Sequence, residues 1–193
     1  MKVLAVNSSA RRDGNTDILI NRVFEELNKE GIETEMIQLA GQVVEPCKAC
    51  WACGGQENCV HRKANFREIF DKMKEADGII LGSPVYTANL SANMQAFLER
   101  ASVVTDMNRD AGPFRHKVGA AVTAARRGGA VSALDAMNHF FLLQEMFVVG
   151  SCYWPLAYGQ MPGDALKDAE GLETMRVLGQ NMAYLLKALK ERR

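Results

Sequence analysis

The stretch KVLAVNSSARRDGNT (residues 2–16) decides the fold expected for this chain. Its opening run, KVLAV (2–6), is short and mostly apolar with two valines, which is typical of a buried central strand. A polar loop that contains Gly14 follows, and the apolar residues beyond it recur at helical spacing until Gly31. A buried strand that leads through a polar loop into an amphipathic helix is the first unit of an alternating α/β fold.

The same alternation continues along the rest of the chain. Further strands are expected at residues 32–39, 78–81, 117–123 and from 147, and further helices at 66–76, 91–104, 131–146 and 171–190. Five strands that alternate with helices predict a parallel sheet with helices on both faces. The order that fits is 2-1-3-4-5, that of a flavodoxin-like doubly wound sheet, and the whole chain (1–193) is expected to be a single domain.

Four of the five cysteines lie close together in the run PCKACWACGGQENC (46–59), with the spacing C-x2-C-x2-C-x5-C. Four soft sulfur donors that can meet at one point suit an iron–sulfur cluster or zinc. Zinc sites usually pair two C-x2-C units a dozen or more residues apart, so the spacing favours a cluster. Zinc and a thiol loop without metal remain the alternatives. The expected ligands, in a cysteine-rich insert at about residues 41–62, are Cys47, Cys50, Cys53 and Cys59.

Charge and hydropathy exclude several classes of partner. The 23 basic and 23 acidic residues balance, and this argues against nucleic acid, because a phosphate backbone selects for a basic face. No apolar run approaches the ~18 residues that span a bilayer, so no membrane contact is expected. The first residues, MKVLAVNSSA, lack a charged segment followed by an apolar one. We therefore expect a cytoplasmic protein in which the cysteines are not paired in disulfides.

The loop at residues 8–16 is the first of three polar loops expected at the carboxyl ends of the strands, where ligands bind in such sheets. Hydroxyls, backbone N–H groups, a guanidinium and a helix N-terminus can together address one phosphate. The loop lacks both the Gly-Lys-Ser/Thr ending of a Walker A loop and a G-x-G-x-x-G turn. The alternative is a plain helix cap made by Asn15 or Thr16.

The second and third loops, at residues 82–89 and 123–129, could border a flat ring. Pro84 restrains the backbone of the second loop, and Tyr86 offers an aromatic face. The third loop contributes glycines for close backbone approach and the arginines 126 and 127. Solvated arginines on an ordinary turn are the alternative for this loop.

Three segments of the chain resemble the NADPH-dependent FMN reductase superfamily of flavodoxin-like fold: SSARRDGNT, GSPVYTANLSANMQAFLER and AARRGGAVSALDAMNHFFLLQEMFVVG. With the compact cysteine run after the second strand, the chain is most similar to the iron–sulfur flavoproteins of that superfamily. The resemblance implies non-covalent FMN, a 4Fe–4S cluster on all four cysteines that exchanges electrons with FMN, and a homodimer or homotetramer. The first loop departs from the common G-S-P-R pattern, because Asn7 and Ala10 replace the Gly and the Pro.

Carried over position by position, the resemblance implies three groups of FMN-binding residues. The phosphate would be held by Ser8, Ser9, Arg11, Asn15 and Thr16. The isoalloxazine would be bordered by Pro84, Val85, Tyr86, Thr87 and Asn89. The third loop would approach through Ala124, Arg126, Gly128 and Gly129.

Three functions of different classes follow from these features. The first is an FMN-dependent electron-transfer oxidoreductase with a 4Fe–4S cluster, whose partner is a redox protein such as a ferredoxin or a small-molecule acceptor. The second is a cluster-free reductase of FMN or quinones with NAD(P)H as electron donor. The third is a non-catalytic zinc-binding or regulatory module. The full cysteine set favours the first, and the FMN loops count against the third. No catalytic side chain is expected, because the flavin ring carries the reaction.

Self-association is also expected. Two aromatic segments, at residues 139–141 and 153–154, could supply an apolar contact surface. The fifth cysteine, Cys152, is expected to be a small buried hydrophobe.

Overall fold

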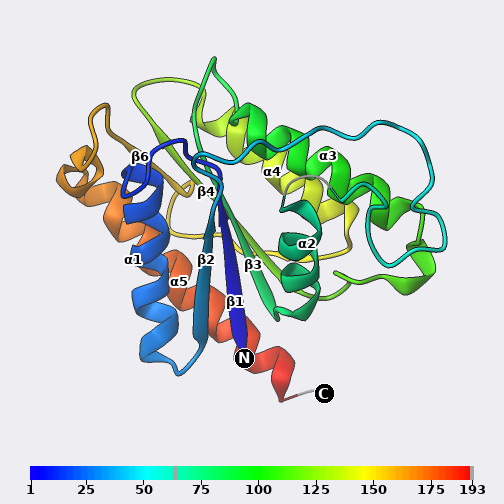
Figure 1. The fold of residues 1–193 in the computed structure, drawn as a ribbon. Coiled ribbons are helices and arrows are strands. Elements are labelled where there is room, and N and C mark those ends of the chain that lie inside the picture. Colours follow the sequence, from blue (N-terminus) through cyan, green and yellow to red (C-terminus); the bar gives the residue numbers. More distant parts are fainter. Residues whose placement is uncertain (63–64, 192–193) are drawn as a thin grey trace.

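The computed structural model of the protein describes residues 1–62 and 65–191. Its elements follow the expected alternation (Figure 1): β1 (Lys2–Asn7), α1 (Asn15–Lys29), β2 (Glu33–Gln38), α2 (Phe66–Glu75), β3 (Gly78–Pro84), α3 (Ala92–Asp106), η1 (Arg109–Ala111), β4 (Val118–Ala125), α4 (Ala130–Leu143), β5 (Phe147–Val148), β6 (Leu156–Tyr158), η2 (Asp164–Lys167) and α5 (Ala169–Lys190). The two η elements are short 3-10 helices.

The strands form one parallel sheet in the order β2-β1-β3-β4-β5, which confirms the expected topology. The fifth position differs from the expectation because two short strands share it. Both β5 and β6 pair with β4, and the seven residues between them (149–155) lie opposite only three residues of β4 (120–122). The surplus residues must leave the sheet, and Pro155 in this segment has no N–H to give to a ladder.

Alternate side chains of the strands build the two hydrophobic layers. Val3 and Ala5 of β1 pack with α1 and α5, whereas Leu4 and Val6 pack with α2, α3 and α4. Figure 1 shows α1 and α5 on one face of the sheet and the other three helices on the opposite face. None of the helices in the described residues is long and apolar enough to cross a membrane.

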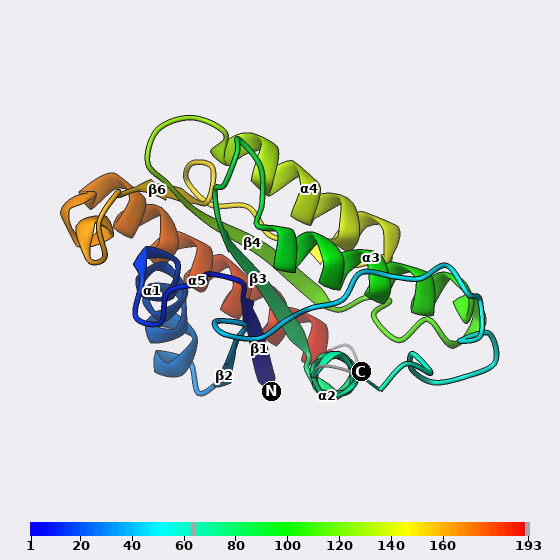
Figure 2. The same ribbon diagram turned by 45° about the horizontal axis from the view of Figure 1, so that its top comes forward.

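The cysteine-rich insert joins β2 to α2 without a helix or strand of its own in residues 41–62. It starts near the beginning of α3, where Asn93 Nδ2 donates to the Gln42 carbonyl at 3.2 Å. It then runs beside α3 before it returns to α2 (Figure 2). Asn108, just beyond α3, receives a hydrogen bond from Gly55 N (2.9 Å) and donates one to the Cys53 carbonyl (2.9 Å). The insert is therefore anchored at both ends of α3.

Two expectations about exposure were wrong. Phe140 and Phe141 are buried rather than available for contacts, because they continue the inner face of α4 that begins with Ala130. Cys152 is exposed rather than buried, since it lies in the segment that leaves the sheet between β5 and β6.

Candidate functional site

The turn between β1 and α1 is buried on its inner side. Ser8, Ser9 and Thr16 are at most 4% exposed. Ser9 N donates to Asn7 Oδ1 at 3.0 Å, and Arg11 N donates to Ser9 Oγ at 3.1 Å. Ser8 N donates to the Gly82 carbonyl at 2.9 Å, which ties the turn to β3. The polar backbone of the turn is thus fixed by its own side chains and by the neighbouring strand.

The start of α1 has unsatisfied donors that face this turn. Gly14 occupies the cap position without a side-chain hydrogen bond, and the buried Thr16 Oγ1 has no partner among the described residues. The first N–H groups of a helix have no partner within the helix, and they carry a partial positive charge. A buried hydroxyl that lacks a partner beside such a terminus fits an anionic group.

The plain-cap alternative does not describe Asn15 or Thr16, because both lie inside α1. Asn15 instead binds η2 and the segment that leads into it: its Nδ2 donates to the Met161 carbonyl at 3.0 Å, and its Oδ1 accepts from Ala165 N at 3.1 Å. Arg11 is exposed and also reaches this segment, since its Nη1 donates to the Gln160 carbonyl at 3.3 Å. These two residues therefore draw residues 158–165 against the first loop.

The second loop ends in a tight turn at residues 86–89. Tyr86 N donates to the Asn89 carbonyl (2.9 Å), and Asn89 N donates to the Tyr86 carbonyl (3.2 Å). The two central residues, Thr87 and Ala88, have φ values of 52° and 59°. Two successive left-handed residues of this kind belong to a type I′ turn and store strain when neither is glycine. The turn leaves the Tyr86 ring about half exposed at the sheet edge, while Pro84 and Val85 are half-buried.

The third loop touches the second. Gly129 has a φ of 89° and caps α4, and a Cβ placed on it would lie 2.5 Å from the Ala88 Cα. Arg126 and Gly128 are exposed at this edge. The side chain of Ala124 is buried in the layer formed with α1 and α5. Its carbonyl accepts from Val85 N at 2.9 Å, so Ala124 positions the second loop through its backbone.

Several residues that brace the loops were missed from the sequence. Ser91 caps α3 by accepting from Met94 N, and its Oγ donates to Ser8 Oγ at 2.7 Å. Thr123 Oγ1 donates to the Ser83 carbonyl at 2.8 Å. Both residues are serine or threonine at the end of a strand or the start of a helix, which is a signal that sequence alone could have given.

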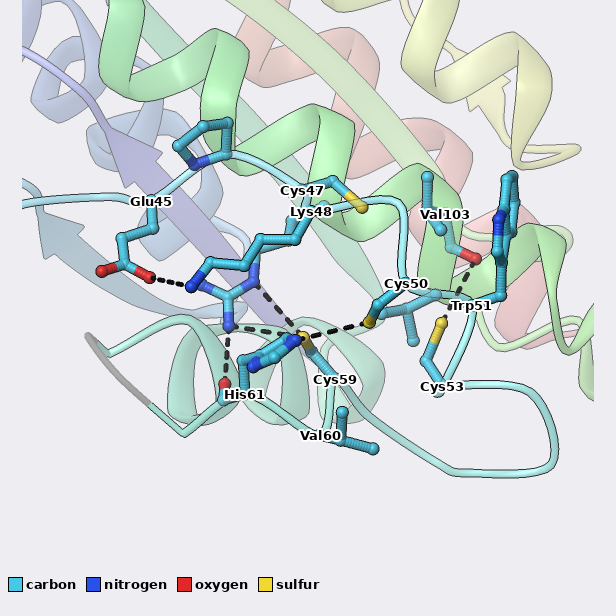
Figure 3. Close-up of a pocket in the computed structure, with 13 residues that line it drawn as sticks. Glu45, Cys47, Lys48, Cys50, Trp51, Cys53, Cys59, Val60, His61 and Val103 are labelled. Atoms are coloured by element: carbon cyan, nitrogen blue, oxygen red, sulfur yellow. Dashed lines mark hydrogen bonds and ion pairs between the residues drawn. The ribbon is translucent and has the colours of Figure 1, made fainter.

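All four clustered cysteines line one pocket between the insert and α3 (Figure 3). Cys53 and Cys59 are buried, Cys47 is half-buried, and Cys50 is exposed; all are free thiols. Cys50 Sγ lies 3.3 Å from His61 Nε2. Within residues 1–62 and 65–191, no three His, Cys, Asp or Glu side chains are arranged to hold a metal ion. The expected ligands therefore share a pocket without forming a metal-binding geometry.

Burial raises the pKa of the Cys53 thiol, and the neighbouring thiols of the pocket raise it further through their charge. The turn that carries them is tightly folded, since Ala49 and Trp51 on either side of Cys50 have φ values of 50° and 58°. The four sulfur donors are chemically soft and line one pocket, which suits a metal centre that binds thiolates.

A buried arginine beside the thiols was not expected from the sequence. Arg100 of α3 lines the pocket and is 2% exposed. It lies on the buried face of α3 with Phe97, Ala101 and Val104. A single cation within an otherwise apolar stripe is a signal in the sequence, but its partner is visible only in three dimensions.

The three loops and the cysteine pocket lie near opposite ends of α3. Ser91 caps the helix beside the loops, whereas Arg100 and Val103 lie nine and twelve residues further on. At a rise of ~1.5 Å per residue, these positions are about 14–18 Å apart along the helix. Only the start of the insert, where Asn93 bonds the Gln42 carbonyl, lies at the end of α3 that adjoins the loops.

Comparison with known proteins identifies the family. Residues 1–160 match the family model described as NADPH-dependent FMN reductase. An iron-sulfur flavoprotein of Methanocaldococcus jannaschii is 39% identical over 99% of this chain and all of the relative. An iron-sulfur flavoprotein of Methanosarcina thermophila is 29% identical over 100% of this chain and 99% of its own length.

The fold has solved counterparts. The structure of RosB with bound 8-demethyl-8-formylriboflavin-5'-phosphate has a TM-score of 0.76 at 18% identity, over 99% of this chain and 81% of RosB. The sequence relatives, the fold and the loops at the sheet edge are thus consistent with one another. The chain belongs to the iron–sulfur flavoproteins of the NADPH-dependent FMN reductase family and is an FMN-dependent oxidoreductase.

Proposed function

We propose that this oxidoreductase holds FMN on its three loops and a 4Fe–4S cluster on Cys47, Cys50, Cys53 and Cys59, and that electrons pass between the two groups. One observation carries the cluster assignment: all four thiols line a single pocket. Four thiolates are the donor set that such clusters use. The curated relatives of this chain that carry the name iron-sulfur flavoprotein support the same assignment.

The first loop fits the phosphate of FMN. Thr16 Oγ1 is buried without a partner, and the N-terminus of α1 faces the same turn. We assign the phosphate to the hydroxyls of Thr16 and Ser9 and to the N–H groups of the first turn of α1. Ser8 braces the turn, whereas Arg11 and Asn15 hold residues 158–165 over it.

The second and third loops fit the isoalloxazine ring. Bound FMN supplies a ring that accepts and donates electrons, so the protein needs to position it. Pro84, Val85, Tyr86 and Thr87 border the ring in this proposal, and Asn89 closes their turn. The remaining assigned positions lie on or beside the third loop. Ala124 contributes through its backbone, and Arg126 contributes a cation that has no hydrogen bond or ion pair among the described residues. Gly128 and Gly129 allow the backbone to approach the ring closely.

We also propose that the protein works as a homodimer or homotetramer. The pocket and the loops lie about 14–18 Å apart along α3 in one chain, so a second copy could shorten the path between them. Tyr153 and Trp154 support this proposal because their rings pack together, 4.7 Å apart, and both stay about half exposed. Electrons would reach the protein from, or leave it to, a redox protein such as a ferredoxin or a small-molecule acceptor.

The second candidate is a cluster-free reductase that uses NAD(P)H. It is favoured by the match of residues 1–160 to the family model described as NADPH-dependent FMN reductase. Anaerobic purification and reconstitution with iron and sulfide separate the candidates. About four irons and four sulfides per chain, with a cluster spectrum added to that of the flavin, support the first. Stoichiometric zinc or four titratable thiols with bound FMN would instead support a zinc loop or the cluster-free reductase.

A further inference from the structure

Arg100 is the only buried lysine or arginine among the described residues. Its Nε and Nη2 lie 3.4 and 3.3 Å from Cys59 Sγ, and both nitrogens donate to that sulfur. Nη2 also donates to the His61 carbonyl at 2.6 Å, and the guanidinium lies over the Phe66 ring, 4.5 Å from its centre. The buried Nη1 has no partner among the described residues.

The charge of Arg100 has no carboxylate partner in the described part of the chain. The other buried charged residue, Glu26, shows the contrast, because Lys29 and Arg22 pair with it at 2.7 and 3.5 Å. A guanidinium stays charged at every accessible pH, and burying that charge without a counter-charge is strongly unfavourable. The sulfur of Cys59 is the acceptor that faces it. An anionic sulfur site is therefore the environment that this arginine requires.

From this geometry we propose that Arg100 is a positioning residue for the metal centre, which orients the Cys59 sulfur as a ligand and raises the reduction potential of the cluster. The inference rests on the proposed function. The cluster gains one negative charge when it takes one electron from a reductant, and no bond forms or breaks. A buried cation that donates N–H groups to a ligand sulfur stabilises that more negative state. The free Nη1 hydrogen atoms provide further donors for sulfur in the pocket.

The test is a potentiometric titration of the reconstituted cluster with dithionite and ferricyanide, followed by electron paramagnetic resonance. Arg100→Gln removes the charge and the donors, whereas Arg100→Lys keeps the charge and loses the two-pronged contact with Cys59. Arg67→Gln is the matched control, because Arg67 Nη1 donates to the backbone carbonyl of the same cysteine at 2.8 Å. The flavin potential of each variant serves as an internal reference, since the loops lie at the other end of α3.

We expect Arg100→Gln to lower the cluster potential by an amount on the order of a tenfold change in the reduction equilibrium, about 59 mV for one electron. Arg100→Lys should lower it by less because it keeps the charge, and Arg67→Gln should lower it by less because Arg67 donates to a carbonyl and not to a ligand sulfur. An unchanged potential in the loaded Arg100→Lys and Arg100→Gln proteins overturns the inference. If Arg100→Gln does not fold, the cluster potential of Arg100→Lys alone tests the inference. A wild-type protein that binds no iron after reconstitution refutes the proposed cluster. That result is distinct from an unchanged potential, which refutes only the role of Arg100.

Discussion

Gly129 lies so close to Ala88 that a Cβ atom on the glycine would stand 2.5 Å from the Ala88 Cα and 2.8 Å from its carbonyl carbon. Both residues have left-handed backbones, with φ values of 89° and 59°. The contact is between two backbones, so neither side can move aside as a flexible side chain would. It fixes the separation of the second and third loops, the two that we propose for the isoalloxazine ring.

Gly129→Ala should therefore separate these loops. The left-handed backbone and the clash together should lower the free energy of unfolding by about 1–3 kcal/mol. FMN affinity should fall as well, and urea unfolding and flavin fluorescence titration measure the two effects. Gly150→Ala is the control, because Gly150 has no positive φ and a Cβ there meets nothing within 4 Å. Equal behaviour of the two variants would contradict the role of this contact.

Thr16→Val tests the phosphate assignment without changing the size of the side chain. The hydroxyl has no partner among the described residues, so its loss should leave the stability of the flavin-free protein unchanged or slightly higher. A hydrogen bond to a charged phosphate contributes about 1.5–3 kcal/mol, so FMN affinity should fall roughly tenfold or more. Riboflavin, which lacks the phosphate, should bind both proteins equally.

Thr174→Val is the matched control for this change. Thr174 is also buried, but its hydroxyl donates to the Glu170 carbonyl at 2.8 Å. The control should lose stability and keep its FMN affinity. An FMN affinity in Thr16→Val equal to that of wild type would remove Thr16 from the phosphate site. Arg11→Ala combined with Thr16→Ala should weaken FMN binding further, because residues 158–165 then lose one of their links to the first loop.

The sheet could be predicted from the sequence because its strands are apolar runs and each is followed by a helical pattern. The pairing of β1 with β3 and of β3 with β4 depends on these continuous buried runs. The split of the fifth position could not be predicted in the same way. It depends on how many residues of β4 are left between two pairing segments, which is a property of the register.

In the candidate site, too, one part could be predicted from the sequence and another part could not. The position of the three loops follows from the strand order, but the use of each side chain does not. The hydroxyl of Ser8 is engaged by Ser91, 83 residues away, and Arg11 by Gln160, 149 residues away. The pairing of Arg100 with Cys59 also joins elements far apart in sequence. Contacts of this kind arise from tertiary packing, which residue spacing along the chain does not encode.

Glu35 gives the protein a pH dependence that is independent of its cofactors. Hydrogen bonds and ion pairs from Lys2 (2.6 Å) and Lys72 (2.7 Å) lower the pKa of this carboxyl. A lowered pKa adds stability that is present above the unfolded value, near pH 4.3, and is lost as the pH falls through the folded value. Because the group is partly exposed, the effect should be at most about 1 kcal/mol.

The check is chemical unfolding of Glu35→Gln and wild type between pH 3 and 7, a range set by the usual carboxyl pKa of about 4.3. Glu35→Gln should be less stable at pH 7, and the difference should shrink toward zero at the acid end. Glu33→Gln, at an exposed position of the same strand, is the control and should show no such trend. A stability difference that stays constant with pH would show that the carboxylate charge is not involved.

The holoprotein should sediment as a dimer or tetramer at micromolar concentration. Replacement of Tyr153 and Trp154 by Ser should shift it toward monomer, because these exposed rings supply the apolar contact surface in our proposal. Tyr184→Ser is the control for the loss of an exposed aromatic ring outside the Tyr153–Trp154 pair, since Tyr184 is 77% exposed on α5. Wild-type FMN-loaded protein that sediments only as monomer would refute the proposed assembly.

Cys59 and Cys50 should differ in what their loss does to the protein before any metal is bound. Cys59 is buried against the Arg100 guanidinium, whereas Cys50 is exposed and contacts His61. Cys59→Ala leaves a buried cation with a lost acceptor, so the apoprotein should lose about 1–3 kcal/mol in free energy of unfolding. Cys50→Ala removes an exposed thiol and should cost the apoprotein little.

After anaerobic reconstitution, both variants should lose iron, because each lacks one of the four ligands that the proposed cluster requires. Cys152→Ala should keep iron at the wild-type level, since this thiol lies between β5 and β6, outside the pocket. Urea unfolding of the apoproteins and iron and sulfide analysis of the reconstituted proteins give the two readouts. Full iron content in Cys50→Ala would exclude Cys50 as a ligand. Equal apoprotein stability of the Cys59 and Cys50 variants would show that Arg100 does not depend on the Cys59 sulfur.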